Sequence, residues 1–239
     1  MTSIRNPGRV AGLWYLALVL IGPLRLMYIP EKLFVHGNAT ATVNNIAAHE
    51  WLFRSGIAAD LVGAVVGIFL ALAFYRLFAE LDRNLAVQVV ILGGILPPAL
   101  YFVNAVSDLA AITIVHGAAY LSVFDKPQRD ALAMLFLNLH DHQNTVAELL
   151  WGLWLLPLAM LVYRSRFLPR FLGVWLALNG VAYVCLSFAG VLFPRYQSRV
   201  FLYSQPMMIA EVALMLWLVI KGGRPPASPT YLPHETIAY

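Results

Sequence analysis

The polar residues from Leu139 to Glu148 open a strongly apolar segment, and they are where chemistry is most expected in this sequence. On a helix of 3.6 residues per turn, Asp141, Asn144 and Glu148 fall on one face. A carboxylate this far inside an apolar helix is costly and needs a partner, which makes Glu148 a functional-site candidate. His140 stands at the start of the same stretch and joins the candidate site.

Three more acids, Asp60, Asp108 and Glu211, lie inside other apolar segments. Asn104 falls one turn before Asp108 on the same helical face and is a further candidate ligand-binding residue. Buried charges are rarely left unpaired, so arginines near the ends of these segments are candidate partners. Those arginines are Arg25, Arg54 and Arg199.

These residues permit three kinds of site. In one, the arginines neutralise the acids in structural ion pairs, and the chain is a structural or interaction protein. In another, which we favour, the acids line a pocket with aromatic walls that binds a small amphipathic or lipid-like molecule. In the third, a desolvated acid is the general acid of an intramembrane enzyme such as a small cyclase or hydrolase. Glu148 is the first choice for that acid and Asp60 the second; the sequence does not decide whether the protein is an enzyme.

A metal site is the less favoured interpretation of the histidines. His116, His140 and His142, with Asp141, are residue types that bind metal ions. Residues two apart on a helix point about 200° away from each other, so His140 and His142 cannot both bind one ion there. No H-E-x-x-H spacing is present either. We therefore expect no metal site and no cofactor.

The composition restricts the class of protein. Of the 239 residues, 61% are hydrophobic and only 12% are charged, and the mean hydropathy is +0.74. A soluble domain with a charged surface cannot be built from such a chain, so we expect an all-α, multi-pass membrane bundle. The net charge of +4 then indicates orientation and contact with membrane lipids. No long solvated stretch is rich in Lys and Arg, so nucleic-acid binding is not expected.

Six apolar segments are long enough to cross a bilayer, which takes roughly 20 residues. We expect them at 10–24, 56–78, 84–116, 142–163, 171–193 and 204–221.

The remaining segments are shorter or more polar. Segment 30–54 is expected to hold a short surface helix capped by Asn38 or Thr40, and segment 117–138 a helical pattern that leads into the fourth span. Pro97 and Pro98 should kink the third span. These elements form one transmembrane domain over 1–221, followed by a disordered tail over 222–239.

An even number of spans places both chain ends on one side of the membrane. The short turns 76–83 and 164–170 lie on that side and are rich in Arg, so the termini are predicted to be cytoplasmic. In this topology the four acids fall in the outer half of the bilayer although their helices run in opposite directions. Arg25 lies at the outer end of the first helix, and this convergence is why we place the site there.

Several stretches also carry a family resemblance: 9–15, 41–46, 52–61, 71–77, 84–86 and 161–174. In these stretches the chain resembles DUF4386, a family of uncharacterised bacterial multi-pass membrane proteins. The resemblance implies a helical protein of the bacterial inner (plasma) membrane, with Arg54, Asp60 and His140 at family-like positions. It implies no activity.

Overall fold

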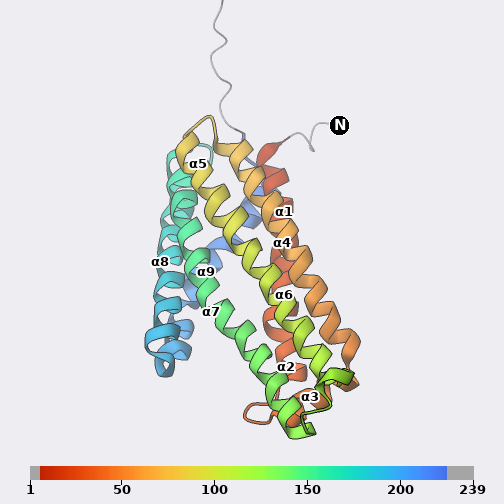
Figure 1. Cartoon of the computed structure of the whole chain (residues 1–239). Coiled ribbons are helices and arrows are strands. Elements are labelled where there is room, and N and C mark those ends of the chain that lie inside the picture. The colour runs from red at the N-terminus through yellow and green to blue at the C-terminus, as the bar shows by residue number, and fades with distance from the viewer. Residues whose placement is uncertain (1–5, 225–239) are drawn as a thin grey trace, which may run out of the picture.

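The computed structural model describes residues 6–224, and these residues contain helices and no strand (Figure 1). Six helical rods are long and apolar enough to cross a membrane. The predicted all-α, six-span bundle is therefore confirmed. The rods are Pro7–Leu33, Glu50–Phe78, Arg83–Val115, Lys126–Arg164, Arg170–Leu192 and Pro194–Ile220.

The first rod is interrupted near its middle. It consists of α1 (Pro7–Pro23), the π-helical turn η1 (Leu24–Tyr28) and the short helix α2 (Ile29–Leu33). Pro23 ends α1 and Pro30 begins α2; a proline removes a backbone donor and crowds the preceding turn, which favours a local change of helix type. Arg25 lies in this widened turn.

The third rod is built in the same way. It consists of α5 (Arg83–Val89), the π-helical turn η2 (Val90–Ile95) and α6 (Leu96–Val115). The expected irregularity at Pro97 and Pro98 is present, but it lies in η2. The two prolines occupy the first turn of α6, where a missing backbone N–H costs nothing.

Three helices begin earlier than expected. Helix α4 (Glu50–Phe78) begins before the predicted residue 56 and includes Arg54. Of the predicted surface helix, only α3 (Ala39–Ala48) remains separate. Its N-cap is Asn38, as predicted. Helix α7 (Lys126–Arg164) begins at Lys126 rather than at residue 142, because a capping box starts the helix there and no proline or glycine lies between residues 128 and 142.

Helix α9 also begins earlier than predicted. It runs from Pro194 to Ile220, and follows α8 (Arg170–Leu192) after a single residue. Pro206 was expected to mark its start but lies inside the helix, and Pro194 takes the first position instead. Glu211 is consequently much farther from the beginning of its helix than predicted.

Both described ends of the chain lie at the same end of the bundle, as predicted (Figure 1). Gly8 N donates to Gly223 O over 3.1 Å, and Gly223 N donates to Asn6 Oδ1 over 3.1 Å. We call this the terminal end. The opposite, distal end carries α2, α3 and the start of α7. From residue 225 onward, the predicted disordered tail lies outside the described residues.

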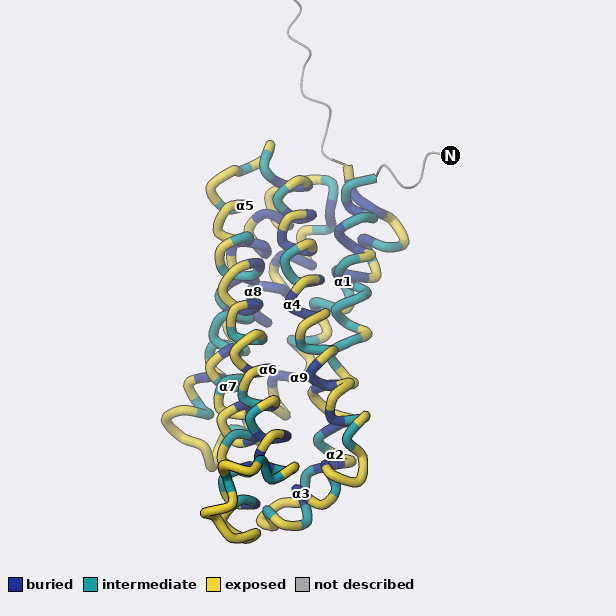
Figure 2. The backbone as a smooth tube through the Cα atoms, turned by 45° about the vertical axis from the view of Figure 1, so that its right-hand side comes forward, coloured by how far each residue is buried: buried dark blue, intermediate teal, exposed yellow. Residues whose placement is uncertain are grey.

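The two larger of the three apolar clusters among residues 6–224 lie one toward each end of the bundle, with dark buried segments along its interior (Figure 2). The cluster toward the terminal end includes Tyr15, Phe74 and Leu158. The distal cluster includes Ile29 and Phe53. On α4 and α7, Asp60 and His140 lie between the residues that these helices contribute to the two clusters, so a polar level separates the two apolar ones. The outward faces carry large exposed apolar side chains, as a membrane-embedded surface requires.

Candidate functional site

Arg25 is the centre of a cluster contributed by four different parts of the bundle. Its Nε donates to Asp60 Oδ2 on α4, and its Nη2 to Asp108 Oδ2 on α6, each over 2.7 Å. His140 on α7 completes the group, which we call the charged layer. The side chains of Arg25 and Asp108 are 6% and 1% exposed, so water does not screen these ion pairs.

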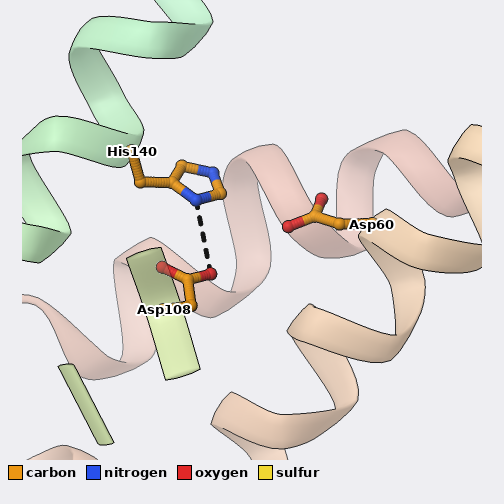
Figure 3. Close-up of side chains that lie close together, drawn as sticks. All are labelled: Asp60, Asp108 and His140. Atoms are coloured by element: carbon orange, nitrogen blue, oxygen red, sulfur yellow. Dashed lines mark ion pairs between the residues drawn. The ribbon is translucent and has the colours of Figure 1, made fainter. Parts of the chain in front are cut away.

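His140 contacts both charged partners. Its Nδ1 lies 3.3 Å from Asp108 Oδ2 (Figure 3). Arg25 Nη2 lies 2.9 and 2.8 Å from the two ring nitrogens, so the guanidinium lies against the imidazole ring and not along one nitrogen's lone pair. With a neutral imidazole, the charged layer holds one positive and two negative charges.

Local sequence positions Arg25 for this role. The π-helical turn between Pro23 and Pro30 carries its side chain into the bundle. Gly56 lies one turn before Asp60, and a Cβ there would meet the Arg25 Cδ at 3.5 Å and the Ile29 Cδ1 at 2.8 Å. A side chain at this position would therefore force Ile29 to shift, whereas the 3.5 Å to Arg25 is ordinary van der Waals contact.

Glu211 is the centre of a second, separate group that contains no charged partner. Tyr15 Oη donates to Glu211 Oε2 over 2.5 Å, and Asn179 Nδ2 donates to Oε1 over 3.0 Å. Tyr15 and Asn179 are fully buried, and Tyr183 lies beside the same carboxyl group. We call Glu211, Tyr15 and Asn179 the neutral cluster.

The neutral cluster does not share the level of the charged layer. At a rise of about 1.5 Å per residue, Tyr15 lies about 15 Å nearer the terminal end than Arg25 does on the same rod. The prediction placed all four acids in the outer half of the bilayer; the structure places Glu211 with Tyr15, apart from Asp60 and Asp108. The cause is the early start of α9 at Pro194, which moves Glu211 toward the terminal end.

Glu148 lies between these two groups. On α7 it is about 12 Å nearer the terminal end than His140. Its Oε2 is buried and has no hydrogen-bond partner among residues 6–224. One turn toward the distal end, Asn144 Oδ1 accepts a hydrogen bond from Asn104 Nδ2 over 3.2 Å, which leaves Asn104 Oδ1 buried and unpartnered as well.

Two of the predicted residues lie outside these groups. Arg54 is exposed and donates to Glu50 on its own helix over 2.5 Å, so it is not the partner of a buried acid. Glu50 in turn contacts His116 Nε2 at 3.0 Å. Asp141 is exposed on the surface of α7, because it faces away from His140.

Sequence reasoning missed two features of the site. Tyr15 was not identified, and its only signal was a hydroxyl within an apolar helix, which is too common to single out. Asp60, Asp108 and His140 were placed in one candidate site but not recognised as a possible ligand set for one ion, although one ligand atom from each lies within 4.8 Å of the others. These residues come from three helices, so no spacing in the sequence indicates that they meet.

Comparison with known proteins agrees with the fold. Residues 10–222 match a family described as Domain of unknown function (DUF4386). No curated protein and no solved structure matches the chain. The matched residues cover most of the chain and include the charged layer, Glu148 and Glu211. This multi-pass protein therefore belongs to the DUF4386 family.

Proposed function

We propose that this integral membrane protein binds a small amphipathic molecule beside Glu148, between the charged layer and the neutral cluster. The observation that carries the proposal is the buried Oε2 of Glu148, which has no partner among the described residues. By contrast, Asp60, Asp108 and Glu211 all accept hydrogen bonds. An unsatisfied buried acceptor costs about 1–3 kcal/mol, which a bound donor recovers.

The chemistry of Glu148 selects the polar head of the ligand. An ionised carboxylate only accepts hydrogen bonds, so the head must donate, as an ammonium or a hydroxyl group does. Trp151 follows one turn later on α7 and packs edge-to-face against Tyr183 on α8, with ring centroids 5.9 Å apart. Aromatic rings of this kind bind ammonium groups and apolar chains. An alkyl amine therefore fits better than a fatty acid.

The position of Glu148 supports access from the distal side. Gln197 Nε2, at the start of α9, donates to Thr145 Oγ1 over 3.4 Å. Glu148 therefore lies about one turn inside the connection between α8 and α9. A ligand that enters the bundle from its distal side places its polar head at Glu148 while its apolar chain stays among apolar side chains.

The enzyme alternative now rests on Glu148. A general acid must exchange its proton with a substrate, and the carboxyl group of Glu148 is not engaged by a cation. Asp60 is the weaker candidate because Arg25 holds its carboxylate. The ion pairs of Arg25 favour a structural role for the charged layer, and they leave Glu148 as the residue for a ligand.

Binding can be tested by thermal unfolding in lipid nanodiscs with dodecylamine, dodecanol and dodecanoate at equal mole fractions. We expect dodecylamine to raise the Tm of the wild type most and dodecanoate least. The Glu148→Gln variant should fold, because no buried cation loses its partner, and should lose the shift. Glu31→Gln, an exposed site on α2, is the matched control and should keep it. Equal amine-induced shifts in wild type and Glu148→Gln refute the proposal.

We also propose that the terminal end is cytoplasmic, which places the charged layer in the outer half of the bacterial inner membrane. The support is the arginine-rich turns at that end, which carry Arg76, Arg83, Arg164 and Arg166. In a Cys185→Ser background, we expect an impermeant thiol reagent outside intact cells to label Lys126→Cys and not Arg166→Cys. The reverse pattern contradicts this orientation.

A further inference from the structure

Asp60, Asp108 and His140 form a group that nothing in the proposed function uses. They come from α4, α6 and α7, and their side chains converge on one point (Figure 3). Two carboxylates and an imidazole are ligand types that divalent transition metals, and zinc in particular, accept. We propose that these three residues bind a zinc-class divalent ion in exchange with the guanidinium of Arg25.

The distances fit such an ion. His140 Nδ1 lies 3.3 Å from Asp108 Oδ2. Two ligand atoms of a tetrahedral site with bonds of about 2.0–2.1 Å are separated by about that distance. The three ligand atoms all lie within 4.8 Å of one another, so Asp60 has to approach by up to about 1.5 Å to complete the set.

The guanidinium group of Arg25 occupies the position proposed for the ion. Arg25 Nη2 lies 2.7 Å from Asp108 Oδ2 and 2.8 Å from a ring nitrogen of His140. The arginine does not satisfy the site, because Asp108 Oδ1 is buried and has no partner among the described residues. A divalent ion balances both carboxylates and can also bind that second oxygen.

Arg25 is placed where it can withdraw. It lies in the π-helical turn between α1 and α2, and irregular turns of this type are frequent at functional sites. Its long side chain can rotate toward the distal surface without moving the helices that carry the ligands. Three protein ligands leave a fourth position open for water, as in catalytic zinc sites.

The competition between Arg25 and the metal gives the test. Chelator-treated protein in detergent is equilibrated with Zn²⁺, and bound zinc is measured by mass spectrometry after desalting. We expect Arg25→Gln to bind zinc about tenfold more tightly than the wild type, the scale on which residues beside metal ligands act. The double variant Arg25→Gln/His140→Ala should lose this binding. Arg25→Gln/His142→Ala, with an exposed histidine removed from the same helix, should keep it.

A second measurement holds even if Arg25→Gln does not fold. Zinc should raise the Tm of the wild type and of Glu148→Gln equally, but not that of His140→Ala. The proposal is overturned if zinc binding and the Tm shift are the same in the wild type and His140→Ala. Because Glu148→Gln should keep the zinc response and lose the amine response, failure of one proposal is distinguishable from failure of the other.

Discussion

The charged layer and the neutral cluster accommodate carboxylates inside an apolar bundle in two different ways. In the charged layer, one arginine is shared by two aspartates from different helices, over 2.7 Å in each case. In the neutral cluster, the Glu211 carboxyl group is held by a phenol and an amide. A buried charge strongly destabilises the fold once its oppositely charged partner is removed. A carboxyl group held by neutral donors can lose its charge at a smaller cost in stability.

The same comparison explains why Glu148 stands apart. Among residues 6–224, its Oε2 has neither a cation, as Asp60 has, nor a hydroxyl donor, as Glu211 has. A buried carboxylate that is not held by an arginine, a phenol or an amide is a place where stability is given up for binding. The expected effects of substitution therefore decrease from Arg25 to Tyr15 to Glu148.

The largest effect is expected from Arg25→Met. This change leaves Asp60 and Asp108 buried without a cation, and loss of a buried partner costs about 3–5 kcal/mol of unfolding free energy. Denaturant unfolding in detergent measures it. Arg54→Met is the matched control, because the exposed pair with Glu50 is worth at most about 1 kcal/mol. Similar losses in the two variants contradict a central role for Arg25.

A smaller effect is expected from Asp60→Leu, because Arg25 keeps its contact with Asp108. A hydrogen bond to a charged group is worth about 1.5–3 kcal/mol, which sets the expected loss. Asp60→Asn should cost less, since its amide oxygen still accepts from Arg25. Combining Asp60→Leu with Asp108→Leu should cost more than the sum of the two, since only the double change isolates the cation. Strict additivity indicates that the two aspartates do not share Arg25.

Smaller effects again are expected from the neutral cluster. Tyr15→Phe removes one donor from Glu211 and keeps the ring that packs against Phe74 and Trp154. We expect a loss of about 1–2 kcal/mol. Glu211→Gln should lose less, because the amide oxygen still accepts from Asn179 or Tyr15. If Glu211→Gln is instead as damaging as Arg25→Met in the same unfolding assay, Glu211 is paired with a cation and the contrast fails.

Several features of the fold and site could be read from the residues. The six spans, the Asn38 cap and the common position of the two chain ends were all predicted. Asp60 and Asp108 were chosen because an ionisable group in an apolar segment is costly, Arg25 as a partner for such acids, and His140 as part of the polar stretch that opens the fourth span. Arg54 was also chosen on proximity to the membrane boundary, but the structure pairs it with Glu50 four residues earlier. A local partner at helical spacing satisfies such a charge more cheaply than a distant one.

Hydropathy alone determined that this chain is a multi-pass helical bundle, because hydrocarbon leaves backbone groups no partners outside the helix itself. Which polar groups meet was decided only in the tertiary structure. Contacts between helices depend on the position of each helix along the bundle axis and on its rotation about its own axis. These are set by the capping box that starts α7, the proline that starts α9 and the π-helical turn that directs Arg25 into the bundle. A shift of a few residues in a helix start leaves the hydropathy pattern unchanged, yet it moves Glu211 out of the charged layer and into contact with Tyr15.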